Sequence, residues 1–448
     1  MASWPRGGER PEMAAAVKTA ADRAPAIAAQ WAAGPVLRGG EAPWLSARRR
    51  KAMEGVRQSG LPTPRVEPWK YTNLNRLAEI GFAAAANDPM PAVDAGTSDI
   101  VLVNGRLRPD VAAAPDLPPG VTIRGLGEAL REDPRLAARL EDEGDDSDAM
   151  LALNTALMTD GVVVTVAPGV AVERPVHLLS VGRAATDAPV AFHPRHLVEL
   201  GAGARLTLIE SHVGDGRYWS HPALRLRLGV EARLDHCKLQ DDAPEAYHIA
   251  HTAAHLEAGA FYESVVLQAG ALLGRNEIRV RLAGERAACN LYGFYLGRDR
   301  QHHDCTTEIT HAEPHTSSRE IYKGVLDDRA RGVFQGRITV ARDAQKADGH
   351  QLSRTLLLSD QAEIDTKPEL EIFADDVKCS HGAAAGELDD DALFYLRARG
   401  IGLAAARRML IEAFLDDLLQ QVSDEAARLA LGRRISTWLA ALPAMEGA

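Results

Sequence analysis

The chain has 448 residues, of which 46% are hydrophobic and 25% charged, a composition typical of a folded protein with a large core. The formal net charge is −11, and lysine and arginine are spread along the chain without a basic run, which argues against nucleic acid or an anionic membrane as the main partner. The four cysteines show neither CxxC spacing nor a dense disulfide framework, and no apolar run approaches the roughly 20 residues of a membrane span. We therefore expect a cytoplasmic protein with reduced thiols, no export signal and no membrane anchor.

Residues 1–95 are predicted to form an N-terminal helical region. The region is rich in alanine and compatible with helix, but the chain must leave the helix at Pro62, Pro64 and Pro68. The stretch "NDPMPAVDAGT" has the composition of a linker, and short β-branched runs begin after it. A domain boundary is expected near residue 95.

Residues 96–388 are predicted to form a β-solenoid core. Short alternating runs such as "RLTLIESHV" and "NEIRVRL" dominate, and long helical periodicity is nearly absent. Several strand-like runs open at steps of 28 residues, at Ala204, Ala232, Ala260, Ala288 and, one step further, Thr316. A coil of this length suits a wound solenoid with two or three short strands in each turn.

Residues 389–448 are predicted to be helical. Asp389 or Asp390 can cap the first helix, which ends at Gly400, and another helix follows from Ser423. Between them, apolar side chains recur at spacings of three and four residues, at Leu403, Ala406, Leu410, Phe414 and Leu418. This stripe fits either a cap on the solenoid or a docking surface for another protein.

Motifs of common enzymes are absent from the sequence. No lysine directly follows a glycine, so there is no Walker A loop, and GxSxG, GxGxxG and HExxH do not occur. The chain is therefore not expected to hydrolyse ATP, and we predict a non-catalytic protein.

Two histidine-rich segments are candidate metal sites, but the residues favour other roles. In "YHIAHTAAH", strand geometry would scatter His248, His251 and His255 between faces, so solvated histidines are favoured over ligands. In "QHHDCTTEITHAEPHTSS", His303 and Cys305 share a face of an extended chain, followed by His311 and His315. Hydrogen-bonded histidines that join adjacent coils are favoured there.

The segment "DDVKCSHGAAAG" holds a sharper candidate. If it is a strand, Cys379 and His381 point to the same side and together present a thiol and an imidazole. Both groups bind iron, zinc or copper, but two ligands cannot complete a four-coordinate site. A metal held here needs further ligands, which a second chain could supply. The alternative is that Cys379 is a small buried residue beside a hydrogen-bonded histidine.

Several runs resemble the SufB/SufD family of the SUF iron–sulfur cluster assembly system. They are "EPWKYTNL", "HAEPHTSSREIYKGV", "GRITVARDAQKADGHQLSRTLLLS" and "KPELEIFADDVKCSHGAAAGELDDDALFYLRARGI", in the family's order across about residues 60–420. The resemblance implies a right-handed parallel β-helix between N- and C-terminal helical regions. It also implies a complex of two paralogues, SufB and SufD, each bound to one copy of the ABC-type ATPase SufC.

Within the family, the chain resembles the SufD branch. SufB sequences look like Gln-Cys-Asp-Ser where this chain has Gln351-Leu352-Ser353-Arg354, and they carry Glu where it has Gly382. The resemblance implies that Cys379 and His381 face SufB and contribute to a nascent cluster that is transferred to apo-proteins, with His381 favoured. It also implies that the C-terminal helices, with Leu403, Leu410, Phe414 and Leu418, bind SufC.

Any iron or iron–sulfur cluster would then be transient and shared with SufB, and the isolated chain is expected to hold none stably. An exposed terminal sheet edge also favours a homodimer of the isolated chain. Two other functions fit a β-solenoid: a polysaccharide-cleaving enzyme and a self-sufficient iron or zinc carrier. The first is disfavoured by the missing signal and the 5% aromatic content, and the second by the incomplete ligand set.

Overall fold

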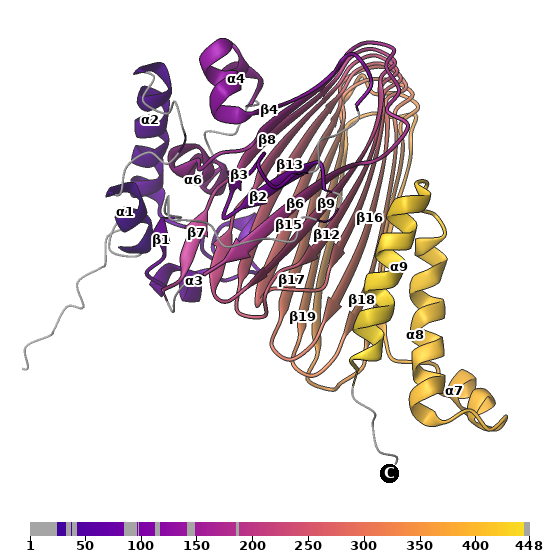
Figure 1. The fold of residues 1–448 in the computed structure, drawn as a ribbon. Helices are drawn as coiled ribbons and strands as arrows, with labels where there is room; N and C mark the ends of the chain where they lie inside the picture. Colours follow the sequence, from indigo (N-terminus) through magenta and orange to yellow (C-terminus); the bar gives the residue numbers. More distant parts are fainter. Residues whose placement is uncertain are drawn as a thin grey trace, which may run out of the picture.

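A computed structural model describes residues 25–32, 37, 43–84, 96, 98–112, 117–140, 148–184 and 188–442. Its centre is a parallel β-solenoid of about seven turns, with helices at both ends of the chain (Figure 1). The predicted mainly-β solenoid with flanking helices is thus confirmed. Residue 95, where we placed the first boundary, lies outside the described residues.

Each full turn contributes one strand to each of two sheets. In the first sheet the order is β4 (Val121–Gly125), β5 (Val162–Val166), β8 (Arg195–Leu200), β11 (Ala223–Leu228), β13 (Tyr247–Leu256), β15 (Leu273–Leu282), β17 (His302–His311), β19 (Arg331–Val340) and β21 (Glu363–Ile372), with β1 (Ala83–Ala84), β7 (Val190–Phe192) and β10 (Tyr218–Ser220) beside it. In the second sheet the order is β3 (Arg106–Leu107), β2 (Ile100–Val103), β6 (Val176–Arg183), β9 (Arg205–Asp215), β12 (Arg233–Asp241), β14 (Phe261–Gln268), β16 (Ala288–Gly297), β18 (Ser317–Leu326), β20 (Asp348–Leu357) and β22 (Lys378–Gly386). Both sheets run in sequence order with every second strand adjacent, as a wound chain requires.

The two ends of the solenoid differ. At the N-terminal end, β3 pairs with β2 and β4 pairs with β5 in antiparallel fashion, so short return strands close both sheets. At the C-terminal end, β21 and β22 each pair on one side only, and none of their residues is buried. The second end therefore presents two open strand edges of nine and ten residues.

A repeated corner fixes the coil length. Before each of the strands β9, β12, β14, β16, β18 and β20, one residue with positive φ precedes a small, fully buried residue. The buried column is Ala204, Ala232, Ala260, Ala287, Thr316 and Ala347, and the residues before it are Gly203, Glu231, Gly259, Arg286, His315 and Lys346. The prediction that Ala288 belongs to this column is wrong by one position, because Phe261 pairs with Ala288 and the coil there is one residue shorter.

Apolar side chains fill the interior of the solenoid, and helices cover part of the outer face of each sheet. The N-terminal helices α1 (Pro25–Ala32), α2 (Pro43–Ser59), α3 (Asn75–Glu79) and α6 (Ala149–Leu157) pack against the first sheet, and α4 (Leu126–Glu132) and α5 (Leu136–Arg139) pack nearby. On the opposite side, α8 (Leu403–Leu419) and α9 (Glu425–Ala440) pack against the second sheet, and α7 (Asp390–Arg397) has no buried residue (Figure 1).

The run "EPWKYTNL" forms a strap across the first sheet, beginning with a short 3-10 helix, η2 (Glu67–Trp69). The Trp69 ring lies 4.1 Å from the Arg275 guanidinium carbon, and Pro68 O accepts a hydrogen bond from Gln335 Nε2 at 3.1 Å. Thr72 Oγ1 donates to Asp304. The three turns that carry these partners are thereby linked to the N-terminal region.

The prediction of an unbroken β core over residues 96–388 misses three helices. α4, α5 and α6 lie between residues 126 and 157, before the regular coils begin. α6 is capped by Asp148, whose Oδ1 accepts hydrogen bonds from the N–H groups of Met150 and Leu151, and almost all its side chains are buried. A helix that is apolar on every side has no 3.6-residue stripe, which is why its sequence did not reveal it.

The C-terminal boundary agrees with the sequence. Asp389 caps α7 by accepting a hydrogen bond from Ala392 N at 3.0 Å, and Gly400 adopts φ 83° after the helix ends. Within the described ranges, no helix is both long and apolar enough to cross a bilayer.

The same substitution, glycine to alanine, is predicted to have opposite effects at a corner and inside a helix. Gly259→Ala should lower the free energy of unfolding by about 1–2 kcal/mol, because an L-residue with positive φ is strained and the new Cβ would lie 3.2 Å from Glu231 Cγ. Gly432→Ala, inside α9, should raise it by about 1 kcal/mol, because alanine favours helix and the nearest atom is 3.5 Å away. Thermal unfolding of both variants checks this, and stabilisation by Gly259→Ala would contradict the corner model.

Candidate functional site

The candidate site is the last turn of the solenoid, where β22 carries Cys379 and His381. In the strand register, Cys379 pairs with Gly349 and His381 pairs with Gln351. The columns beneath them run back to Leu206 and Leu208, which lie in the interior core cluster. Both side chains therefore occupy inward positions, as predicted for residues two apart on a strand, and His381 is exposed because no further turn stacks on it.

Cys379 is half-buried and packs against the interior core cluster. Burial raises the pKa of its thiol, a backbone hydrogen bond at Gly349 partly offsets this, and the charge of Asp348 reinforces it. The side chain is thus a neutral thiol at neutral pH in the chain alone. Binding of a metal, or a base supplied from outside, is needed to make it a thiolate ligand.

Below His381 the column is polar. Gln351 Nε2 donates a hydrogen bond of 2.7 Å to Glu320 Oε2, and both residues are buried. Burial raises the pKa of Glu320 to about 7, against the opposing hydrogen bonds of Thr307 and Gln351. A carboxyl group that titrates near neutrality therefore lies two strands beneath the exposed imidazole.

The outer face of the same end holds a histidine that the sequence did not single out. His350 Nδ1 is 2.6 Å from Ser380 Oγ, and its Nε2 is 2.8 Å from Asp348 Oδ1. His350 lies on the neighbouring strand, 31 residues before His381, and faces the opposite side of the sheet. Only the register of β20 and β22 brings these residues together.

The histidines of "YHIAHTAAH" lie on β13 and are scattered between faces, as predicted, but two of them are not solvated. His248 is fully buried, with Nδ1 3.0 Å from Asp242 Oδ2, and His251 is buried beneath the N-terminal region. His255 is half-buried, with Nε2 3.3 Å from Glu257. The expectation of solvated histidines is wrong for His248 and His251, because the turns that follow and the N-terminal helices cover this strand.

The second histidine segment is structural in part. His311 Nδ1 lies 2.8 Å from Thr316 Oγ1 and its Nε2 lies 2.9 Å from Ser318 Oγ. These contacts join β17 to β18 within one coil, whereas the sequence favoured histidines that join adjacent coils. Cys305 is buried and its Sγ donates to Gln268 Oε1 at 2.8 Å. Burial also raises the pKa of Cys305, which makes it a poor metal ligand. His303 is buried nearby, whereas His315 is a corner residue with positive φ.

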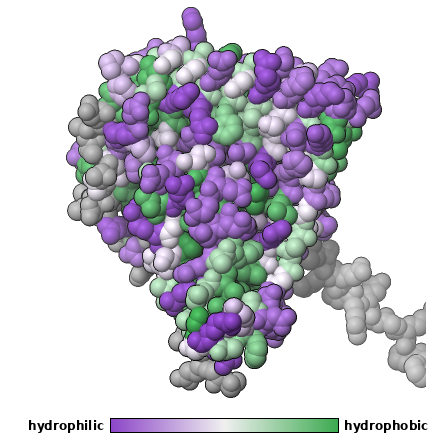
Figure 2. Space-filling model, turned by 90° about the vertical axis from the view of Figure 1, so that its right-hand side faces the viewer, coloured by the Kyte–Doolittle hydropathy of each residue, from purple (hydrophilic) through white to green (hydrophobic). Residues whose placement is uncertain are grey.

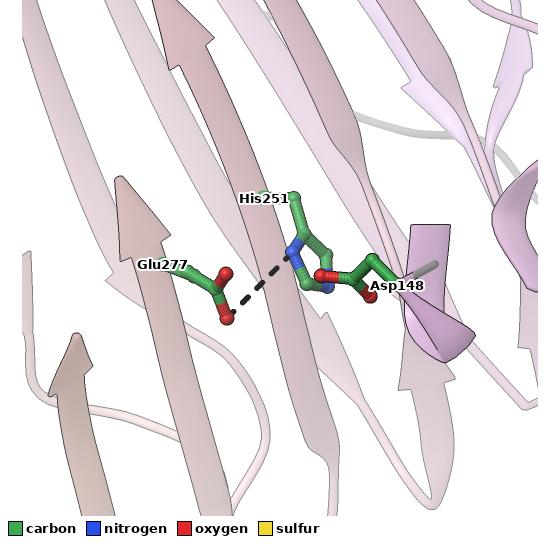
Figure 3. Close-up of side chains that lie close together, drawn as sticks. All are labelled: Asp148, His251 and Glu277. Atoms are coloured by element: carbon green, nitrogen blue, oxygen red, sulfur yellow. Dashed lines mark ion pairs between the residues drawn. The ribbon is translucent and has the colours of Figure 1, made fainter. Parts of the chain in front are cut away.

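Asp148, His251 and Glu277 form the one group in the described chain whose spacing would suit a metal ion (Figure 3). The imidazole lies between the two carboxylates, with His251 Nδ1 3.9 Å from Glu277 Oε2. Arg279 pairs with both carboxylates, and Arg275 Nη2 lies 2.9 Å from Glu277. Burial would raise the pKa of Glu277, but the two arginines outweigh it and lower the pKa.

A cation at this group would have to displace Arg279 from both carboxylates. The cluster instead joins the N-terminus of α6, through Asp148, to strands β13 and β15 of the solenoid. We therefore assign it to ion pairing between the N-terminal helices and the first sheet.

Some side chains of the predicted apolar stripe are buried in the structure, and others are only half-buried. Leu418 is fully buried against the second sheet, so its assignment to a docking surface is wrong. Leu403, Leu410 and Phe414 are half-buried, and Lys323 Nζ lies 4.7 Å above the Phe414 ring. The buried side of the stripe packs against the outer face of the second sheet, so α8 covers this sheet and does not cap the solenoid's end, which was the other prediction.

Other apolar side chains of these helices are exposed. They are Phe394 and Tyr395 on α7, Met409 on α8 and Leu429 on α9, and the exposed fraction of Phe394 is 74%. Hydrophobic residues gather in the lower half of this side of the molecule (Figure 2), and a groove of about 500 Å³ runs between α8 and α9.

Fold and site together define a parallel β-solenoid protein with helices at both ends of the chain and an open terminal turn. Comparison with known families identifies it further. Residues 183–414 match the SUF system FeS cluster assembly, SufBD core domain, and residues 33–178 match the SufBD protein N-terminal region. The chain belongs to the SufBD family of iron–sulfur cluster assembly proteins and is a homologue of SufD.

Individual relatives are similar to this chain over most of their length. The iron–sulfur cluster assembly protein SufD of Escherichia coli is 32% identical over 407 residues, which cover 87% of this chain and 92% of that protein. An iron–sulfur cluster assembly SufBD family protein of Synechocystis is 32% identical over 399 residues, covering 84% and 87% of the two chains. The resemblance inferred from the sequence motifs is confirmed at the level of the family.

The buried carboxyl of Glu320 predicts a pH-dependent stability. Because the native pKa of about 7 lies above the ordinary value of 4.5, the folded state holds the proton more tightly, so its contribution to stability is full below pH 4.5 and is lost as the pH rises towards 7. Glu320→Gln keeps an acceptor for Gln351 and removes this loss, which is on the order of 3 kcal/mol. The melting temperature of the variant relative to wild type should therefore rise between pH 5 and pH 8, and a difference independent of pH would contradict the assignment.

Proposed function

We propose that this chain is the SufD-like component of a SUF complex with SufB and SufC, and that it works in the cytoplasm. It helps form a nascent iron–sulfur cluster at its interface with SufB, from which the cluster passes to apo-proteins. The chain itself is non-catalytic, and ATP is hydrolysed by SufC. The observation that carries this proposal is the open last turn, where Cys379 and His381 share the inward side of an unpaired edge strand.

The ligand count explains why the cluster would be shared. Cys379 and His381 offer one sulfur and one nitrogen atom, whereas an iron–sulfur cluster or a four-coordinate iron needs more ligands. SufB would supply the others, so a cluster assembled here is cargo of the complex, and the isolated chain holds none stably. His381 is the stronger contributor, because its side chain is exposed while the Cys379 thiol is half-buried with a raised pKa.

The geometry of the edge supports a protein partner. β22 leaves backbone N–H and C=O groups unpaired along nine residues, which is a template for pairing with a strand of another chain. The other open strand, β21, is a poorer template, because it carries Pro368 and several charged side chains. SufB, as a paralogue, would offer a matching edge. In the absence of SufB, a second copy of this chain would occupy the same edge as a homodimer.

SufC docking is proposed for the exposed apolar side chains of α7 and α8. Phe394, Tyr395 and Met409 are exposed although apolar, and half-buried Leu403, Leu410 and Phe414 lie on the adjoining helix. Large aromatic side chains of this kind are typical anchors of protein interfaces.

The first test is the yield of cluster on a reconstituted complex with SufB and SufC. His381→Ala should lower the yield several-fold, because the exposed imidazole is lost from the shared site. His350→Ala is the matched control, since it removes an exposed histidine from the outer face of the same end and should leave the yield unchanged. Iron and sulfide analysis measures both, and wild-type yield from His381→Ala would reject the proposal.

The second test concerns SufC. The double variant Phe394→Ser, Tyr395→Ser should reduce SufC capture in a pull-down by about tenfold, because removal of interface aromatics commonly costs more than 1 kcal/mol each. Leu429→Ser, an exposed leucine on α9, is the control and should retain capture. Equal capture by all three proteins would exclude α7 as the docking element.

A further inference from the structure

A second pocket lies far along the chain from the Cys379 and His381 pair, between the strap and the corners that lead into β15, β17 and β19. Its volume is about 380 Å³. Arginines come from two separate parts of the chain: Arg76 follows the strap, and Arg300, Arg329 and Arg331 come from two consecutive turns. We call these residues the arginine pocket.

Most of this positive charge is not neutralised within the chain. Arg331 pairs with Asp365, with Nε 3.0 Å from Oδ2, and its Nε is 3.9 Å from Glu363. Arg329 Nε donates to the neutral Gln361 at 2.7 Å. Among the described residues, no carboxylate lies within ion-pair distance of Arg76, Arg300 or Arg329.

The register makes two of these charges neighbours. His302 pairs with Arg331, and Arg329 N donates to Asp299 O, so the same register places Arg300 beside Arg329 on adjacent turns. Adjacent strands lie about 4.8 Å apart, and like charges directly opposite each other are destabilising. An anion bound between the two guanidinium groups would remove this repulsion.

The acidic side chains of the corner do not act as the anion between Arg300 and Arg329. Asp299 and Asp328 both have positive φ, and Asp299 N donates to Asp328 Oδ2 at 3.0 Å, so one carboxylate is engaged by backbone. Asp304, deeper in the structure, is engaged by Thr72 and Arg275. His302 adds no charge, because burial lowers its pKa to about 4.

The remaining walls are mixed, with aromatic and apolar side chains beside the polar Asn73 and Gln301. Tyr71 and Tyr247 line the pocket together with Leu272 and Leu273. The volume is more than ten times the roughly 30 Å³ share of a water molecule in the liquid, so it exceeds the need of a single small ion. Guanidinium groups match phosphate oxygens in bidentate geometry, and tyrosine rings suit a planar heterocycle.

We propose that the arginine pocket binds a nucleoside phosphate, with the phosphates between Arg300 and Arg329 and the base against the tyrosines. The overall charge of −11 repels anions from the rest of the surface, so binding would be confined to this focus of positive charge. The pocket does not include β22, the strand of Cys379 and His381, although its Arg331 pairs with Asp365 on β21, the other open strand. Binding of ADP is measured on the isolated chain, so its failure would leave the proposed cluster function untouched.

Calorimetric titration of the full isolated chain with ADP, in EDTA and at 0.05 and 0.3 M salt, tests the proposal. Wild type should bind one ADP per chain, more weakly at the higher salt concentration, and Arg300→Gln with Arg329→Gln should weaken binding by at least about tenfold. Arg281→Gln with Arg319→Gln removes the same charge elsewhere and is the control. Arg281 lies near the far end of β15, whose first residue, Leu273, lines the pocket.

Inorganic pyrophosphate and Tyr71→Leu separate the two halves of the ligand. Tighter binding of ADP than of pyrophosphate, lost in Tyr71→Leu, supports a nucleoside phosphate, whereas equal binding of both overturns the nucleoside assignment. No ADP binding at 1 mM, or undiminished binding by the Arg300 and Arg329 variant, overturns the site. The melting temperature gives a second measure: without ligand, Arg329→Gln should melt at a higher temperature than wild type at low salt, because the like-charge contact is relieved.

Discussion

The structure depends on the in-register stacking of successive turns. A single turn of the solenoid cannot bury its own apolar side chains, and each gains its interior only when another turn lies on it. The backbone enforces this at the corners, where Glu231 N donates to Ala258 O and His315 N donates to Gln345 O of the following turn. The small buried residue beside each corner leaves room for this close approach. Coil length, columns of side chains and position of the open end all follow from the same constraint.

Stacking also explains why polar side chains that could bind a metal lie at the last turn. Along the inner column that ends at Cys379, the side chains change from leucine through Tyr262 and Cys289 to Ser318 and Gly349. The neighbouring column is mixed earlier, with His236, Ser264 and Leu291, and its last three side chains, Glu320, Gln351 and His381, are all polar. Neither column ends in a large apolar side chain where the next turn is missing. The raised pKa of Glu320 is the electrostatic consequence, because its carboxyl group is still buried while the column above it opens to solvent.

The sequence contained enough to predict the architecture but not its register. The step of 28 residues identified the solenoid, although from β8 onward the real coils vary from 26 residues between Tyr247 and Leu273 to 32 between Arg331 and Glu363. Corners with Glu231, Arg286, His315 or Lys346 at positive φ hide the usual glycine signal. Cys379 and His381 could be paired from strand alternation alone, since they are two residues apart. Their neighbours Glu320, Gln351 and His350 could not, because one or two unequal coils separate them along the chain.

The asymmetry of the two ends is the final consequence of the winding. At the beginning, β3 and β4 turn back and close the sheets with antiparallel pairs, so no long parallel edge is left there. At the other end, the chain leaves β22 and passes directly to α7, which does not return to cover the edge and buries none of its own residues. Long unpaired strands are normally blunted by charge, proline or a covering element, because they otherwise pair with other chains. Here the two open strands differ: β21 is blunted by Pro368 and its charged side chains, whereas β22 carries the small residues 382–386, which leave its backbone accessible. An accessible strand edge would promote aggregation of a monomer, but pairing with another solenoid would require it. His381 lies at the surface that such a partner would cover.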